Sequence, residues 1–202
     1  MKSLIGNPNL KNTVRSVRIE RLEDYSALDR FTCVPRQLTS SHVNSHDDYL
    51  LIDDFLKHKA LDFEKSHLFR TKIIVDGHGN ILAFYALCSG TRMVYRKFRE
   101  QTHVPSTARN KAIPTIEMIW FAVATEHQHK GIGRKTLQHI YTDVISAAKI
   151  VGACIFIVEA TADARFFYEQ NGFKDIGEPH KAEGDVILGV SVADLESSCE
   201  NS

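Results

Sequence analysis

The chain carries the sequence Gln128-His129-Lys130-Gly131-Ile132-Gly133 directly after an apolar run at residues 119–123. Such a run is typical of a buried strand, and the residues after the glycines have the apolar spacing of a long helix. The glycines therefore stand at a strand-to-helix junction. A helix start leaves backbone N–H groups without intrahelical partners, and the helix dipole favours an anion there. The stretch predicts a phosphate-binding loop.

Two other kinds of phosphate loop fit this stretch poorly. A Walker loop has glycine directly before its Lys-Ser/Thr pair, whereas Arg134 precedes Lys135 and Thr136 in this chain. A dinucleotide fingerprint has a third small residue at the position that Thr136 occupies. The pattern that remains is Q-x-x-G-x-G.

This pattern, followed by FFYEQNGF at residues 166–173, resembles the GNAT superfamily of N-acetyltransferases. The strand before the loop, the helix after it and a second strand at 154–160 occur in the order of the family's acyl-CoA core. The resemblance implies an enzyme that uses acetyl-CoA as co-substrate and holds its pyrophosphate in the glycine loop. A cytoplasmic location is expected because the sequence shows neither a membrane-helix run nor a signal-peptide apolar region.

The pattern of elements predicts an α/β (α+β) fold in a single domain. The expected strands are 17–22, 69–75, 81–88, 115–123, 154–158 and 185–192, with a hairpin turn at 76–80. The expected helices are 25–31, 47–60, 131–152 and 163–170. Together they indicate the GNAT-like arrangement, a mixed, mainly antiparallel central sheet with helices on both faces.

Length and composition predict one domain at residues 14–194, between a polar lead-in at 1–13 and a polar tail at 195–202. No apolar run approaches the ~20 residues of a membrane helix, and the N-terminus lacks a signal-peptide apolar region. The four cysteines are widely scattered, which indicates reduced thiols.

The resemblance assigns cofactor contacts to the loop and to the strand before it. Backbone amides at 129–134 would converge on the pyrophosphate, while Arg134 and Lys135 add positive charge. Residues 121–123 would pair with the pantetheine arm as a further strand. The expected contacts are Phe121, Ala122, Val123, Gln128, His129, Lys130, Gly131, Ile132, Gly133, Arg134, Lys135 and Thr161, which replaces the asparagine of many family members.

Three residues are expected to act in catalysis. The backbone N–H of Phe121, at a strand bulge, would polarise the thioester carbonyl. Glu117 would act as the base, with a pKa raised by its apolar neighbours; the alternatives are a solvent-facing residue or a structural ion pair. Tyr168 would protonate the leaving thiolate, since its unperturbed pKa near ~10 is close to that of a thiol, unless it is only a core aromatic.

A metal site is not predicted, although the chain has ten histidines. The closest pairs are His42 with His46 and His127 with His129. Neither pair has a third ligand at a suitable spacing. The second pair falls in the cofactor loop, where exposure to solvent explains it.

The acceptor stays open between two classes of amine. Residues 53–61, 83–90 and the long connection to Ile113 also resemble acetyltransferase toxins of toxin–antitoxin pairs, which acetylate aminoacyl-tRNA. Six basic residues lie between Thr91 and Ile113: Arg92, Arg96, Lys97, Arg99, Arg109 and Lys111. The first four would contact tRNA phosphates in that interpretation.

Three features favour a small-molecule or protein amine instead: the net charge is zero, the chain is longer than these toxins, and they do not rely on a glutamate at position 117. A hypothesis of another class is a non-catalytic sensor domain that binds acyl-CoA. A homodimer is also open.

Overall fold

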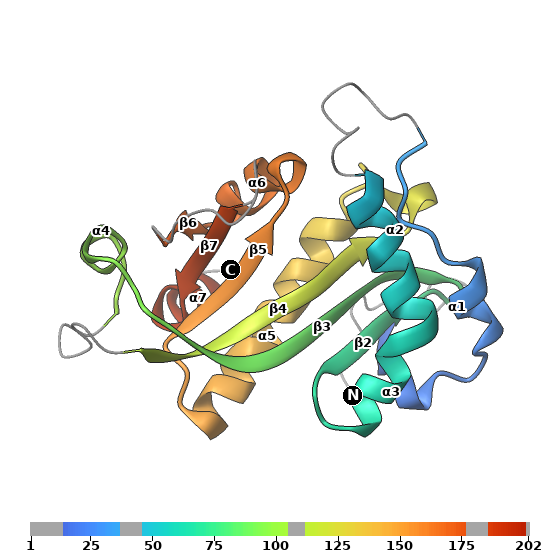
Figure 1. The fold of residues 1–202 in the computed structure, drawn as a ribbon, viewed down its shortest axis with the longest axis horizontal. Helices are drawn as coiled ribbons and strands as arrows, with labels where there is room; N and C mark the ends of the chain where they lie inside the picture. The colour runs from blue at the N-terminus through green and yellow to red at the C-terminus, as the bar shows by residue number, and fades with distance from the viewer. Residues whose placement is uncertain (1–13, 37–45, 105–111, 177–185, 201–202) are drawn as a thin grey trace. The chain divides into compact units, whose positions relative to one another are not determined.

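The computed structural model describes residues 14–36, 46–104, 112–176 and 186–200 (Figure 1). The strands are β1 (Arg15–Arg18), β2 (Arg70–Val75), β3 (Ile81–Arg92), β4 (Ile113–Val123), β5 (Ile155–Ala160), β6 (Lys174–Asp175) and β7 (Val186–Ser191). The helices are α1 (Ser26–Arg30), α2 (His46–Asp54), α3 (Ala60–Lys65), α4 (Arg96–Glu100), α5 (Ile132–Val151), α6 (Ala162–Glu169) and α7 (Val192–Glu200).

The seven strands have the order β1-β2-β3-β4-β5-β7-β6. β4 and β5 are parallel, whereas β1–β2, β2–β3, β5–β7 and β6–β7 are antiparallel pairs. The predicted fold class, a mixed and mainly antiparallel sheet with helices, is therefore confirmed.

Contacts divide the chain into two compact units. The first comprises Met1–Leu87 and Trp120–Thr136, and the second comprises Cys88–Ile119 and Leu137–Ser202. β3, β4 and α5 therefore each contribute residues to both units. The glycine loop belongs to the first unit, and Tyr168, Glu117 and α4 belong to the second.

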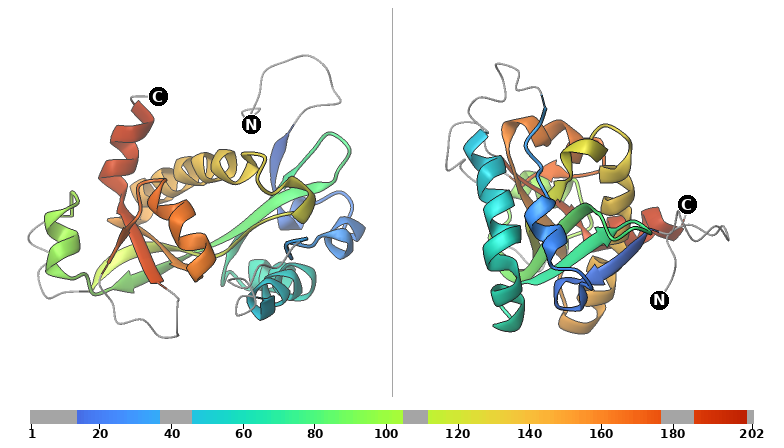
Figure 2. Two further views of the ribbon diagram at one scale, coloured as in Figure 1. Left: turned by 90° about the horizontal axis from the view of Figure 1, so that it is seen from above. Right: turned by 90° about the vertical axis from the view of Figure 1, so that its right-hand side faces the viewer.

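The first unit has an aromatic core beneath an interrupted helix. A π-helical turn, Phe55–Lys59, joins α2 to α3, and α1 lies beside this turn (Figure 2). Phe55 and Leu56 are consecutive and both buried. Phe55 stacks on Trp120 with 4.9 Å between ring centroids.

Glu64 fixes the end of this helix to the neighbouring strands. Its carboxylate is fully buried and accepts hydrogen bonds from the Arg18 side chain and, at 2.7 Å, from the backbone N–H of Thr71. Arg70 Nη1 lies 3.4 Å from the same carboxylate. A buried carboxylate without such partners would strongly destabilise the fold, so these bonds determine where α3 ends against β1 and β2.

The second unit is organised around β5 and β7, which pair along six residues. Phe98 of α4 is buried in the core cluster that also contains Ile155 and Ile176. A Cβ at Gly189 would lie 2.9 Å from Ile176 Cγ2 and 3.3 Å from Phe98 Cζ. Glycine at this position of β7 therefore leaves the space into which α4 anchors its aromatic residue.

Several predicted elements need correction. The strand predicted at 17–22 ends at Arg18, where a 3-10 turn, Ile19–Arg21, begins. The helix predicted to end at residue 60 continues to Lys65. The sequence did not predict α4, β6 or α7, and residues 195–200 of the expected polar tail belong to α7. The predicted lead-in at 1–13 lies outside the described residues.

Candidate functional site

The glycine loop of the first unit has the backbone geometry of a strand-to-helix turn. β4 ends at Val123, a 3-10 turn occupies Thr125–His127, and α5 begins at Ile132. His129 and Gly131 have φ values of +56° and +77°, in the left-handed region. Glycine reaches this region without strain, which explains Gly131. The predicted junction is thus present.

The charged side chains of the loop face solvent at the start of α5. His129, Lys130, Arg134 and Lys135 are exposed, and Ile132 and Gly133 are half-buried. The helix start leaves its first N–H groups without intrahelical partners, so exposed cations and amides occur together there. An anion could bind this turn through both.

Gln128 differs from the other predicted contacts because its side chain binds the protein itself. Its Nε2 donates to the backbone carbonyls of Cys33, at 2.8 Å, and Val123, at 3.1 Å. A primary amide has two hydrogens to donate, and both are used here. Gln128 therefore holds the shape of the loop, and its amide nitrogen is not oriented to donate to a ligand.

The strand before the loop places Phe121 and Val123 in half-buried positions and buries Ala122. The paired register of β4 with β5 runs from Thr115 to Met118, while β4 continues to Val123. The expected contacts of residues 121–123 with pantetheine, and the role of the Phe121 N–H, stay predictions.

Thr161 of the second unit is the residue before α6. Its backbone carbonyl accepts hydrogen bonds from the N–H groups of Ala164 and Arg165. Its side chain makes no capping hydrogen bond to the helix. The expected contact of Thr161 with the pantetheine arm stays a prediction.

Tyr168 is buried in α6 of the second unit, among aromatic rings. Its ring centroid lies 5.2 Å from that of Phe167 and 5.3 Å from that of Phe173. Burial raises the pKa of Tyr168 above its ordinary value, and the neighbouring Tyr141 adds to this shift. The hydroxyl therefore keeps its proton to a higher pH than the unperturbed phenol on which the acid role was argued, and the role itself stays a prediction.

Glu117 is buried, but its surroundings are not simply apolar as expected. Arg92 Nε donates to Oε1 at 2.9 Å, and Arg92 Nη2 donates to Oε2 at 2.7 Å. Thr115 Oγ1 donates to Oε1 at 3.0 Å. This two-point pairing fixes the position of the carboxylate. The structural ion pair, one of the alternatives for Glu117, is what the structure contains.

Gly90 makes room for this ion pair and was missed in the sequence. A Cβ at Gly90 would lie 2.6 Å from Glu117 Cδ and 2.9 Å from Thr115 Oγ1. Gly90 and Arg92 are two residues apart on β3, and Thr115 and Glu117 are two residues apart on β4. Residues two apart on a strand share one face, so this spacing is the signal that could have indicated the cluster.

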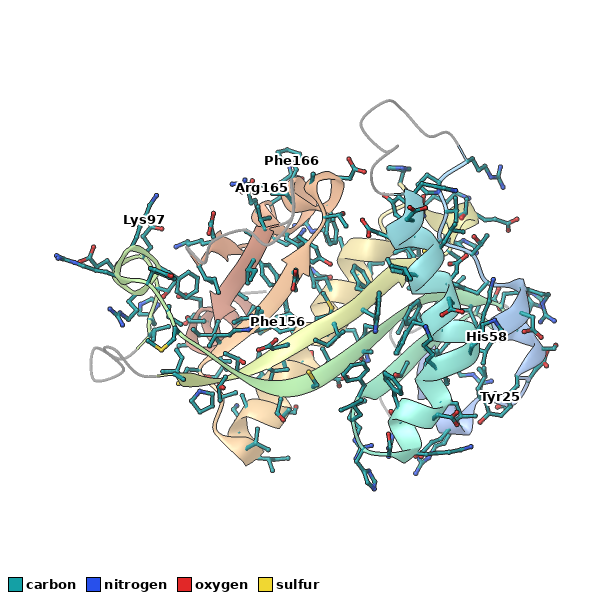
Figure 3. All side chains as sticks on the ribbon, viewed as in Figure 1. Tyr25, His58, Lys97, Phe156, Arg165 and Phe166 are labelled. Atoms are coloured by element: carbon teal, nitrogen blue, oxygen red, sulfur yellow. The ribbon has the colours of Figure 1, made fainter. Side chains whose placement is uncertain are left out.

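The predicted nucleic-acid contacts lie in different settings. Arg92 is half-buried and paired with Glu117. Arg96 is exposed and pairs with Glu100 at 2.6 Å, and Lys97 is exposed beside it (Figure 3). Arg99 is half-buried. Arg109 and Lys111 lie outside the described residues.

Among the described residues, no group of three or more His, Cys, Asp or Glu side chains is placed to hold a metal ion. His42 lies outside this part of the chain. None of the helices in the described ranges is both long and apolar enough to cross a membrane.

The raised pKa of Tyr168 predicts a loss of stability at alkaline pH. An unfolded tyrosine ionises near pH ~10, so above that pH the unfolded state binds fewer protons than the folded state. The stabilisation is complete below about pH 10 and is lost as the pH rises further. We expect Tyr168→Phe to reduce the fall in unfolding free energy between about pH 10 and pH 12, measured by urea unfolding.

Tyr25→Phe is the control for this slope, because Tyr25 is an exposed tyrosine of the first unit. It should keep the wild-type slope. The buried thiol of Cys33 also has a raised pKa, but it is present in every variant and cancels from the comparison. A wild-type slope in Tyr168→Phe would contradict the burial effect.

Comparisons with known proteins agree with this geometry. Residues 74–175, about half of the chain, match the family model of the acetyltransferase (GNAT) domain. Three solved structures illustrate the likeness of fold. A mutant of the toxin AtaT bound to the antitoxin AtaR C-terminus and acetyl-CoA is 20% identical, with 92% of this chain and 97% of that chain covered and a TM-score of 0.67.

AtaT complexed with acetyl-methionyl-tRNAfMet is 20% identical, with coverages of 92% and 98% and a TM-score of 0.70. A structure described as a bacterial toxin is 15% identical, with coverages of 95% and 97% and a TM-score of 0.75. GNAT enzymes use acetyl-CoA as co-substrate, and the family match includes both the glycine loop and Tyr168. The chain belongs to the GNAT family of acetyltransferases.

Proposed function

We propose that the chain transfers the acetyl group of acetyl-CoA to the α-amino group of an aminoacyl-tRNA. The observation that carries this choice of acceptor is the Arg92–Glu117 ion pair. The carboxylate is poorly placed to take a proton from an amine, because both of its oxygens already accept hydrogen bonds from the protein.

Without a protein base, the acceptor must itself supply the neutral amine. An α-amino group has a pKa of about 7.7–8.0, so roughly a tenth of it is neutral at pH 7. A lysine side chain, with a pKa of about 10.4, is neutral in less than about one molecule in a thousand. The chemistry therefore favours an α-amine over a lysine or an aliphatic amine.

The basic helix α4 supports a polyanionic substrate. Phe98 is buried in its unit, whereas Arg96 and Lys97 are exposed, so these cations have a defined position. Helix anchoring lowers the entropy lost when the side chains bind phosphates. The AtaT complex with acetyl-methionyl-tRNAfMet is a precedent on the same fold.

The three sequence features that favour another amine weigh less once contacts are considered. The net charge of zero counts several acidic residues of the first unit that already form ion pairs there. These residues are Asp53, Asp54, Asp62 and Glu64. The extra length is small, since AtaT aligns over 92% of this chain. The third feature, the glutamate at position 117, is paired with Arg92.

In the proposed reaction, the amine nitrogen attacks the thioester carbonyl carbon, a C–N bond forms and the C–S bond breaks. The Phe121 N–H would stabilise the developing oxyanion. Tyr168 would give its proton to the departing thiolate, and the excess proton of the amine would return through water to the Tyr168 phenolate, which restores the enzyme. Cations and N–H groups of the loop would hold the pyrophosphate throughout.

Two other functions make different predictions. An enzyme for small-molecule or protein amines would release thiol from acetyl-CoA with such amines and ignore tRNA. A sensor domain would bind acetyl-CoA without turnover. Following thiol release with aminoacyl-tRNA, deacylated tRNA, polyamines and peptides as acceptors tests all three, and the proposal requires activity with aminoacyl-tRNA alone.

Gly131→Val should weaken acetyl-CoA binding by more than a factor of ten in calorimetry. A β-branched residue disfavours φ near +77° and places a side chain where the backbone would approach the pyrophosphate. Gly79→Val is the matched control, because Gly79 has φ +82° and, like Gly131, has open space around a Cβ. Equal affinities for the two variants would refute the loop assignment.

Tyr168→Phe should lower kcat by about 10²- to 10⁴-fold while acetyl-CoA affinity stays close to wild type, because general acid catalysis has this magnitude. Glu117→Gln provides the comparison. If Glu117 were the base, the acidic limb of the pH–rate profile would shift in this variant. The proposal expects the acidic limb of Glu117→Gln to keep the pKa of the acceptor amine. A wild-type kcat in Tyr168→Phe would remove Tyr168 from the mechanism.

Binding of aminoacyl-tRNA should weaken as salt rises, because each phosphate contact releases counterions. Charge reversal of Arg96 and Lys97 should abolish binding and spare acetyl-CoA affinity. Arg165→Glu is the control, since Arg165 of α6 (Figure 3) pairs with Glu169 at 2.7 Å, much as Arg96 of α4 pairs with Glu100. Salt-insensitive binding, or equal losses in both variants, would contradict the role of α4.

A further inference from the structure

The segment Thr32–Val34 of the first unit is hydrogen-bonded on two sides. On one side, Thr125 binds it: its backbone N–H donates to the Thr32 carbonyl at 2.9 Å, and its Oγ1 donates to the Val34 carbonyl at 2.6 Å. Gln128 Nε2 donates to the Cys33 carbonyl at 2.8 Å. The turn that leads into the glycine loop and the first residue of the loop are therefore tied to this segment by the side chains of Thr125 and Gln128.

On the other side, Asp53 of α2 binds the same segment. Its Oδ1 accepts the backbone N–H of Cys33 at 2.9 Å, and its Oδ2 lies 3.9 Å from Lys57 Nζ. Asp53 is buried, with 7% of its surface exposed. Burial of a carboxylate is unfavourable unless specific partners compensate for the lost water. Asp53 therefore cannot be explained as a solvated surface charge.

Asp53 and Thr125 bind opposite ends of one peptide group. The N–H of Cys33 and the carbonyl of Thr32 belong to the same peptide plane, and each end has a partner. Hydrogen bonds at both ends of a peptide polarise one another and fix its orientation. The adjoining Cys33 carbonyl, which Gln128 binds, is then fixed as well.

We infer that Asp53 is a positioning residue for the cofactor loop and acts through the backbone of Thr32–Val34. The loop has a need for such support, because His129 adopts φ +56°, which is unfavourable for a residue with a Cβ. A conformation of this kind persists only where neighbouring contacts determine it. This inference rests on the proposed binding of acetyl-CoA at residues 128–135.

Asp53→Ala should raise the KM and the Kd for acetyl-CoA by about 10- to 100-fold, because small displacements of a preorganised site have effects of this size. The kcat at saturating acetyl-CoA should change little, since Asp53 touches no reacting atom. Asp53→Asn keeps an oxygen that can accept the Cys33 N–H and should recover most of the affinity. Thr125→Val, which loses only the Oγ1 donor, should weaken binding in the same direction.

Glu64→Gln is the matched control. Glu64 is another buried carboxylate of the first unit, and it binds Arg18, Arg70 and Thr71 instead of the 32–34 segment. It should lose stability and keep acetyl-CoA affinity. Equal losses of affinity in Asp53→Ala and Glu64→Gln, or no rescue by Asp53→Asn, would make Asp53 merely structural and overturn the inference.

Hydrogen exchange of the cofactor-free protein separates this inference from the proposed function. Asp53→Ala should speed exchange of the amides at 125–135 at least tenfold, and Glu64→Gln should leave them at the wild-type rate. If the wild type failed to bind acetyl-CoA, the proposed function would fail while this measurement still decided the role of Asp53. Where Asp53→Ala does not fold, Thr125→Val gives the same test, and unchanged exchange in it overturns the inference.

Discussion

A carboxylate taken out of water needs a specific partner, and this requirement connects the main elements of the structure. The buried carboxylates among the described residues are Asp53, Glu64 and Glu117. Each is bonded to a different part of the chain: Asp53 to the backbone of Cys33, Glu64 to β1 and β2, and Glu117 to Arg92 of β3. Removing one partner of a buried pair costs about 3–5 kcal/mol, so each pairing strongly restricts how its elements pack.

The sequence predicted those features whose signals are local. The junction of β4 and α5 follows from an apolar run and two glycines, and the hairpin at 76–80 follows from turn residues, since both depend on neighbours within a few positions. Tyr168 was found through a contiguous motif. Its burial in the second unit follows from packing with Phe173, which that motif also contains.

Partners that are distant in the sequence were not predicted. The surroundings of Glu117 were expected to be apolar because Ile116 and Met118 flank it in the sequence. Its partner, Arg92, lies 25 residues away in the sequence. α4 has only five residues, and its position depends on a glycine in β7 that leaves space for Phe98. Gln128 fitted the motif of a ligand contact, but Cys33, 95 residues earlier, takes its amide. In each case the deciding neighbour comes from tertiary packing.

The raised pKa of Tyr168 is compatible with the α-amine acceptor that we propose. The reaction needs a neutral amine and a protonated acid at the same pH. An α-amine is largely neutral above about pH 8, and an unperturbed tyrosine begins to lose its proton near pH ~10. Burial raises the pKa of Tyr168, so the pH range in which the amine is neutral and the phenol is still protonated extends to higher pH. A lysine acceptor, with a pKa of about 10.4, would become neutral only near the top of this pH range.

With Glu117 held by Arg92, the chain offers no carboxylate at this position to deprotonate such an amine. In the proposed mechanism, the ion pair with Arg92 occupies the carboxylate that a lysine acceptor would require as base, and the raised pKa of Tyr168 keeps its hydroxyl protonated where an α-amine is neutral.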